Sequence, residues 1–128
     1  QRLSISWIAQ RTALAALQGP VDHIEQFKSD LRERRDYVMN RVNAIEGLSA
    51  VEPKGAFYAF IQVDNTKGRW KDDWDLVYKI LDKGVVTVPG SGFGMPREGK
   101  VLYFRITFLP EVSTLKKAFD KIEEVLKG

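Results

Sequence analysis

Residues 99–109 read Gly99-Lys-Val-Leu-Tyr-Phe-Arg105-Ile-Thr-Phe-Leu109 and form the most strongly patterned segment of the chain. Its β-branched and aromatic side chains alternate along the chain, and this pattern predicts a strand with at least one buried face. Arg105 interrupts the apolar run between Phe104 and Ile106. Because a guanidinium does not lose its proton, it needs an anion or several acceptors when it is held near a core.

Two interpretations of Arg105 are open. In the first, Arg105 lies on an edge strand and extends its charged head into water, or it pairs with an acid of a neighbouring element. In the second, its fork of N–H groups receives a carboxylate or phosphate through two parallel hydrogen bonds. Residues 84–100 comprise a short apolar strand and a loop with four glycines. They favour the second interpretation, because a rigid strand beside a glycine-rich loop can build a small-molecule site.

The composition is that of an ordinary globular chain. Of the 128 residues, 44% are hydrophobic and 29% are charged, and a chain of this length can bury one core. The net charge of +3 comes from 20 basic residues scattered among 17 acidic ones, so we expect no nucleic-acid partner. Neither a long apolar run nor a leader is present, so we expect no membrane span and no signal peptide. The lack of cysteine excludes disulfides and thiolate metal sites and favours a cytoplasmic location.

Two helices are predicted in the first third of the chain. Residues 4–18, which Ser4 or Ser6 can cap, are rich in alanine and poor in charge, so we expect a partner chain or preceding residues to cover this helix. Residues 21–46 predict a longer helix with one buried face, in which apolar residues recur at intervals of seven. These residues are Ile24, Leu31, Val38 and Ile45.

The remainder predicts a small α/β layer. Residues 56–63 are apolar on both faces and predict a central strand. A helix from Asp72 or Asp73 to about Lys83, a strand over 85–88 and a final helix after Pro110 complete the order. The residues expected to face inward are Trp74, Val77, Tyr78 and Leu81 in the first of these helices, and Leu115, Phe119, Ile122 and Leu126 in the last.

Phosphate- and dinucleotide-binding motifs are incomplete. Residues 94–100 have the glycine and lysine spacing of a P-loop, but Val101 stands where serine or threonine is required. A predicted strand follows, so no helix N-terminus faces a phosphate. The glycines at 90, 92 and 94 fail the dinucleotide pattern, because Met95 occupies the position of its last glycine.

Catalytic and metal-binding patterns are missing as well. Ser91 lacks a nucleophile elbow, and His23, the only histidine, is expected to be exposed. Asp72, Asp73 and Asp75 are explained by capping and helix-dipole effects, and no zinc spacing is present. The residues alone thus predict a chain that binds an anion and does not catalyse a reaction.

Several motifs, in this order and spacing, resemble the C-terminal region of class I/II (fold type I) pyridoxal-phosphate-dependent aminotransferases, with the aspartate aminotransferase-like branch as the nearest match. The motifs are Pro53-Lys-Gly-Ala-Phe-Tyr58, Val88-Pro-Gly-Ser-Gly-Phe-Gly94 and Phe104-Arg-Ile-Thr-Phe108. Residues 10–17 and 27–36 are similar to the helices that follow the cofactor lysine in that family.

The resemblance implies an α/β (α+β) fold with two parts. Residues 1–46 would be the end of the large domain and the linking helix, and residues 47–128 would be the small C-terminal domain, a short mixed sheet covered by helices. Arg105 would receive the substrate α-carboxylate, and Phe57 would lie near the substrate. The parent enzyme would use pyridoxal 5′-phosphate to move an amino group between an α-amino acid and a 2-oxo acid, and would be a homodimer.

The resemblance also implies that this chain is inactive alone. In the family, the lysine that binds the cofactor precedes the region matched here, and none of the 11 lysines lies in such a motif. Without it, no amine is placed for covalent catalysis. Two alternatives remain open: a non-catalytic interaction or oligomerisation module, and a sensor of small carboxylates.

Overall fold

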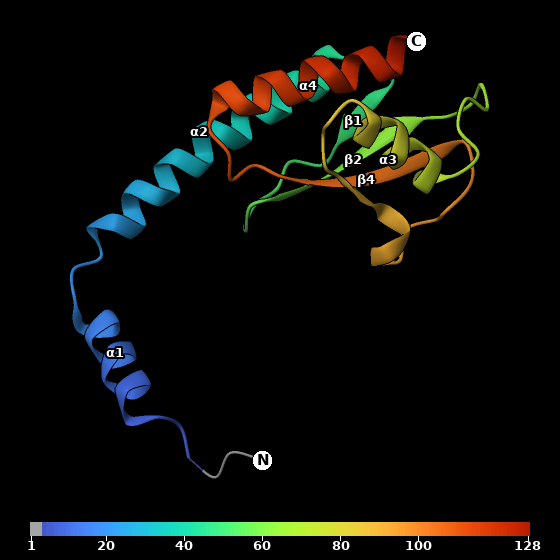
Figure 1. Ribbon diagram of the computed structural model, residues 1–128. Helices are drawn as coiled ribbons and strands as arrows, with labels where there is room; N and C mark the ends of the chain where they lie inside the picture. The colour runs from blue at the N-terminus through green and yellow to red at the C-terminus, as the bar shows by residue number, and fades with distance from the viewer. Residues whose placement is uncertain (1–3) are drawn as a thin grey trace. The chain divides into compact units, whose positions relative to one another are not determined.

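The computed structural model describes residues 4–128 and shows two compact units along the chain. The first extends to Asp30 and contains α1 (Trp7–Gln18) and the start of α2 (Asp22–Ala44) (Figure 1). The second, Leu31–Gly128, contains the rest of α2 and all of the strands.

The first unit exposes its apolar side chains. Helix α1 forms as predicted, but none of its residues is buried, and Trp7, Ile8 and Leu17 are largely exposed. Ser6 occupies the N-cap position, although its side chain makes no capping hydrogen bond. Among the described residues of the first unit, therefore, none provides the expected covering of this helix.

The second unit is built on a four-stranded sheet. The strands are β1 (Leu48–Ala50), β2 (Tyr58–Asp64), β3 (Val88–Pro89) and β4 (Val101–Thr107). Their order is β1-β2-β4-β3, so β2 is central as predicted. The sequence did not predict β1, and β3 shares only Val88 with the strand expected over 85–88.

The expectation of a mixed sheet is wrong, because every adjacent pair of strands in the described residues is antiparallel. The crossover through α3 (Asp73–Asp82) leaves β2 and β3 running in the same direction, which is the usual result of a strand–helix–strand unit. However, β4 lies between these two strands and pairs with both in the antiparallel sense. Strands β2 and β3 therefore run parallel to each other, but they are not hydrogen-bonded to each other.

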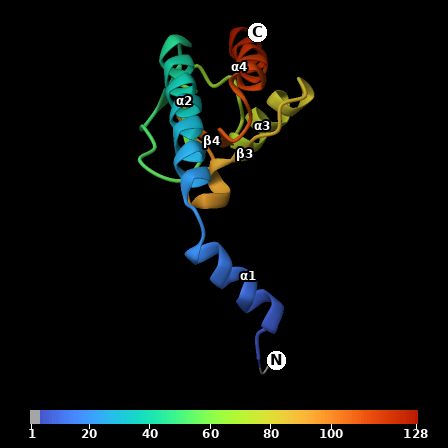
Figure 2. The ribbon, with the colours of Figure 1, turned by 90° about the vertical axis from the view of Figure 1, so that its left-hand side faces the viewer.

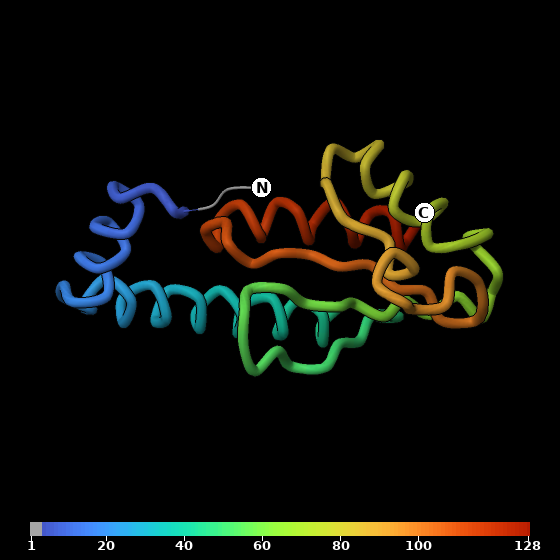
Figure 3. The backbone as a smooth tube through the Cα atoms, turned by 90° about the horizontal axis from the view of Figure 1, so that it is seen from below, coloured from blue at the N-terminus to red at the C-terminus, as the bar shows by residue number. Residues whose placement is uncertain are grey.

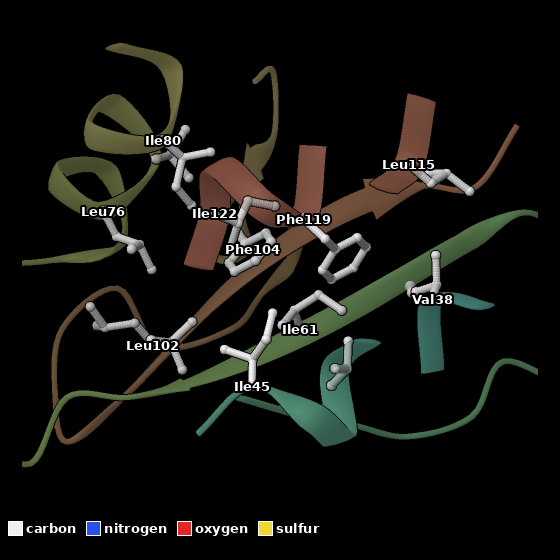
Figure 4. Close-up of a cluster of buried hydrophobic side chains, with 14 of the residues drawn as sticks. Val38, Ile45, Ile61, Leu76, Ile80, Leu102, Phe104, Leu115, Phe119 and Ile122 are labelled. Atoms are coloured by element: carbon white, nitrogen blue, oxygen red, sulfur yellow. The ribbon is translucent and has the colours of Figure 1, made fainter. Parts of the chain in front are cut away.

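Helices α2, α3 and α4 (Val112–Lys127) supply one buried cluster with β2 and β4. Figures 1 and 2 show α2 and α4 side by side, and Arg41 of α2 pairs with Asp120 and Glu123 of α4 at 2.9 and 3.0 Å. The cluster contains Val38, Ile45, Ile61, Leu76, Ile80, Leu102, Phe104, Leu115, Phe119 and Ile122 (Figure 4). Full burial stabilises each of the larger side chains by about 1.5–3 kcal/mol. The stripe predicted for α4 is confirmed, with Leu126 only partly buried.

The buried face predicted for α3 is wrong at three of its four residues, and only Val77 is buried as expected. Its buried residues are Asp73, Leu76, Val77 and Ile80, whereas Trp74, Tyr78 and Leu81 are exposed. Both sets have helical spacing and differ by a one-residue rotation of the helix, so periodicity cannot separate them. Leu76, Val77 and Ile80 belong to the buried cluster, and the buried Asp73 carboxylate accepts a hydrogen bond from the Ser91 amide of η1.

The opposite face of the sheet is not covered by these helices. On this face β2 presents Tyr58, Phe60 and Gln62, which are exposed or half-buried. A short 3-10 helix, η1 (Gly90–Phe93), lies on this side of the sheet, away from α4 (Figure 1). Figure 3 views the strands and η1 from that side.

Candidate functional site

Arg105 lies on the uncovered face of β4, half-buried, in the middle of the strand. Its Cα is directly opposite Phe60 of β2 and Val88 of β3, so the strand is paired on both sides at this position. The interpretation that placed Arg105 on an edge strand is therefore wrong. Because successive side chains of a strand point to opposite faces, and Phe104 points into the core, the Arg105 guanidinium lies on the face that the helices leave open.

The Arg105 guanidinium is surrounded by aromatic rings instead of acids. Its Cζ atom lies 4.3 Å from the centroid of the Tyr58 ring and 4.1 Å from that of Phe93. The Phe93 ring in turn packs edge-on against Phe60, with centroids 5.6 Å apart. Within residues 4–128, no carboxylate forms an ion pair with Arg105, and no protein acceptor takes a hydrogen bond from it. Its N–H groups can therefore meet a planar anion such as a carboxylate.

Phe57 is connected to Arg105 through Tyr58. The rings of Phe57 and Tyr58 lie 4.6 Å apart, and Phe57 packs against the buried cluster. The residue before Phe57, Ala56, has a φ of 56°, a left-handed conformation that costs a non-glycine residue about 1–2 kcal/mol. Phe57 therefore packs against the buried cluster while Arg105 lies on the uncovered face, and the Tyr58 ring is near both.

The turn that carries Phe93 requires glycine at position 90. A Cβ atom on Gly90 would lie 2.4 Å from the Cβ of Tyr103 and 3.2 Å from that of Met95. Gly94, with a φ of 83°, then ends η1 by donating its N–H to the carbonyls of Gly90 and Ser91. Sequence reasoning saw the glycines but missed Phe93. The position of Phe93 between Gly92 and Gly94 was the sequence feature that could have identified it as a site residue.

Two aspartates at the start of α3 hold the same turn and the loop after it. The buried Asp73 carboxylate accepts a 2.7 Å hydrogen bond from the Ser91 amide, and its own N–H donates to the Arg97 carbonyl at 2.9 Å. Asp72 caps the helix, as predicted, by accepting from the Asp75 amide at 2.8 Å. It also pairs with the Arg97 side chain at 2.8 Å. Capping and the helix dipole, which the sequence analysis used to explain Asp73, do not account for its hydrogen bond to Ser91.

The charge state of Asp72 follows from these contacts. The N–H of Asp75, first, and the Arg97 guanidinium, second, lower the pKa of the Asp72 carboxyl below its ordinary value. Both donors favour the ionised form. Asp72 therefore stays charged near neutral pH and keeps its ion pair with Arg97.

The described residues do not fit a covalently bound pyridoxal cofactor. All 11 lysines have solvent-exposed side chains, and an amine that forms a Schiff base is normally desolvated or placed beside another cation. Among residues 4–128 there is no group of three or more histidine, cysteine or acidic residues able to hold a metal ion. Over the same residues, no helix has the length and apolar character needed to cross a bilayer.

Comparisons with known proteins agree with the fold and the motifs. No family model matches the chain. An aspartate aminotransferase from Rhizobium meliloti is 35% identical over 130 residues, covering 95% of this chain and 30% of the relative. An aromatic-amino-acid aminotransferase from Thermococcus litoralis is 38% identical over 104 residues, covering 81% and 25%.

A solved structure has a similar fold over most of this chain. Alanine aminotransferase from Pyrococcus furiosus matches with a TM-score of 0.82 and 41% identity, over 93% of this chain and 29% of that protein. The chain is therefore related to the aspartate, aromatic and alanine aminotransferases, which confirms the resemblance seen in the sequence. It spans about 30% of the length of the curated relatives it matches, consistent with a C-terminal portion.

Proposed function

We propose that the chain is the C-terminal portion of a pyridoxal-phosphate-dependent aminotransferase and supplies Arg105 as the receptor of the substrate α-carboxylate. The reaction would move an amino group between an α-amino acid and a 2-oxo acid, and both substrates carry such a carboxylate. The observation that carries the proposal is the guanidinium of Arg105. It is fixed on an interior strand, contacts two aromatic rings and has no acid partner among residues 4–128.

The part that these residues play is binding and orientation. A bidentate pair between Arg105 and a carboxylate would fix the direction of the α-carbon relative to the sheet. Phe57, connected through Tyr58, would form part of the apolar wall beside the substrate. The exposed lysines supply no candidate for the covalent step, so that step would use residues outside this chain.

The arrangement of the parent enzyme is part of the same proposal. Residues 47–128 would form the small domain, and residues 1–46 would form the end of the large domain and the linking helix. The exposed apolar side chains of α1 fit burial against further protein, either the rest of the polypeptide or the second copy in a homodimer. A cytoplasmic location agrees with the amino-acid metabolism implied by this reaction.

The test is a comparison of Arg105→Ala with wild type in the full-length reading frame, using amino-acid donors and 2-oxo acid acceptors. We expect the absorbance band of the bound cofactor to remain, and kcat/KM to fall on the order of 100-fold or more, because charge-assisted hydrogen bonds are lost. Arg32→Ala, on an exposed part of α2, is the matched control and should have no such effect.

Two results would contradict the proposal. An Arg105→Ala enzyme with unchanged kcat/KM would remove Arg105 as the receptor. A full-length protein that forms no cofactor band would instead favour a non-catalytic interaction or oligomerisation module.

A further inference from the structure

The rings that contact Arg105 come from different parts of the chain. Tyr58 belongs to β2, whereas Phe93 belongs to η1 and reaches Arg105 across the uncovered face of the sheet. Phe93 also contacts Phe60, the residue directly opposite Arg105. Removing Phe93 would leave the guanidinium with one ring contact, that of Tyr58, and would remove the ring that contacts both Arg105 and Phe60.

We propose that Phe93 is a positioning residue for Arg105 and that Asp73 holds Phe93 in place through the Ser91 amide. This inference deepens the proposed function and rests on it. An arginine side chain has many rotamers and loses this freedom when it binds a ligand. Ring contacts made before binding remove part of that cost, so the carboxylate binds more tightly to a prearranged guanidinium.

Asp73 is placed for this supporting role. Its carboxylate is buried, and one oxygen accepts from the Ser91 amide while the other, Oδ1, has no hydrogen-bond partner in the described residues. The N-cap position of α3 is taken by Asp72, so capping does not explain a second, buried acid. Its location in the first turn of α3 favours the negative charge through the helix dipole.

Gly90 completes the support from the other side. The close approach of Gly90 to Tyr103 sets η1 directly against β4, two residues before Arg105. The turn is thus fixed at one end by strand contact and at Ser91 by Asp73. Phe93, three residues after Gly90, has little freedom to leave the guanidinium.

The experiment compares Phe93→Leu, Phe93→Tyr and Arg105→Ala in the full-length protein with its cofactor. Phe93→Leu keeps apolar volume but loses the ring, and should raise KM for the amino acid about two- to thirtyfold, with kcat changed less than about twofold. Phe93→Tyr keeps the ring and should retain the wild-type KM. Tyr78→Leu removes an exposed aromatic residue of α3 and is the matched control, with no change in KM.

A second pair of variants tests the support from α3. Asp73→Ala should raise KM in the same way as Phe93→Leu, because Ser91 loses its acceptor. Asp73→Asn retains an amide oxygen for that hydrogen bond and should recover most of the loss. An equal effect of both variants on KM would overturn the role assigned to Asp73.

An NMR measurement on the 128-residue chain separates positioning from loss of fold. The Arg105 Nε–H proton should be shifted by the ring currents of Tyr58 and Phe93, and Phe93→Leu should move it toward its unstructured value while core resonances stay in place. If Arg105→Ala is impaired but Phe93→Leu keeps its KM and this shift, only the inference is overturned. If Arg105→Ala is fully active, the proposed function fails and the inference fails with it.

Discussion

Substitution of Gly90 by alanine tests how tightly η1 is fixed against the sheet. The new Cβ would lie 2.4 Å from the Cβ of Tyr103 and 3.0 Å from its carbonyl oxygen. Carbon atoms prefer a separation of about 3.5–4.0 Å, so the turn or the strand must move by roughly 1 Å. β4 is paired with both β2 and β3 at its centre, so we expect the turn to move instead.

The expected cost is at the upper part of the range for overpacking, about 2–3 kcal/mol of unfolding free energy. For a unit the size of Leu31–Gly128, this corresponds to a fall in Tm on the order of 10 °C. Urea unfolding, followed by far-UV circular dichroism and by the fluorescence of the buried Trp70, measures the free energy directly.

Gly92→Ala is the matched control within the same turn. A Cβ on Gly92 meets no atom within 4 Å, and its φ is not positive. We expect no loss of stability, or a gain of about 0.4–1 kcal/mol from the less flexible unfolded chain. If Gly90→Ala and Gly92→Ala had the same urea midpoint, the reasoning that β4 holds η1 at a fixed distance would be refuted.

Two further predictions follow from α3. Ile80→Ala should cost about 2–5 kcal/mol in urea unfolding, whereas Leu81→Ala should cost far less, because Ile80 is 0% and Leu81 44% exposed; the reverse order would restore the buried face expected from the sequence. Asp72→Asn should lower stability at pH 7, because the lowered pKa of Asp72 means that its ionised form is favoured in the folded state. This contribution is present above the unfolded-state pKa of about 3.9 and is lost as the pH falls through the folded-state value, so the gap in urea midpoint between wild type and variant should shrink below about pH 4. A gap that does not change with pH would show that the ionised form of Asp72 does not carry the effect.

The periodic parts of the fold could be predicted from the sequence. Alternation identified β2 and β4, and the helical stripe of Leu115, Phe119 and Ile122 identified the buried face of α4. These signals are strong because one face of each element meets a dry core, and the residue pattern must follow that face. Arg105 was singled out for the same reason, since a permanent charge in an apolar strand requires an explanation.

The tertiary structure alone decided which of two equally periodic faces of α3 is buried. It also decided the antiparallel order of the sheet, because the insertion of β4 between β2 and β3 depends on contacts far apart in the chain. The surroundings of Arg105 also depend on contacts between distant segments. Phe93 is 12 residues away along the chain and Tyr58 is 47 residues away, so no local pattern indicates that their rings contact one guanidinium. The sequence alone marked Arg105 as a charge that needs an explanation, and the pairing of distant segments determined which rings surround it.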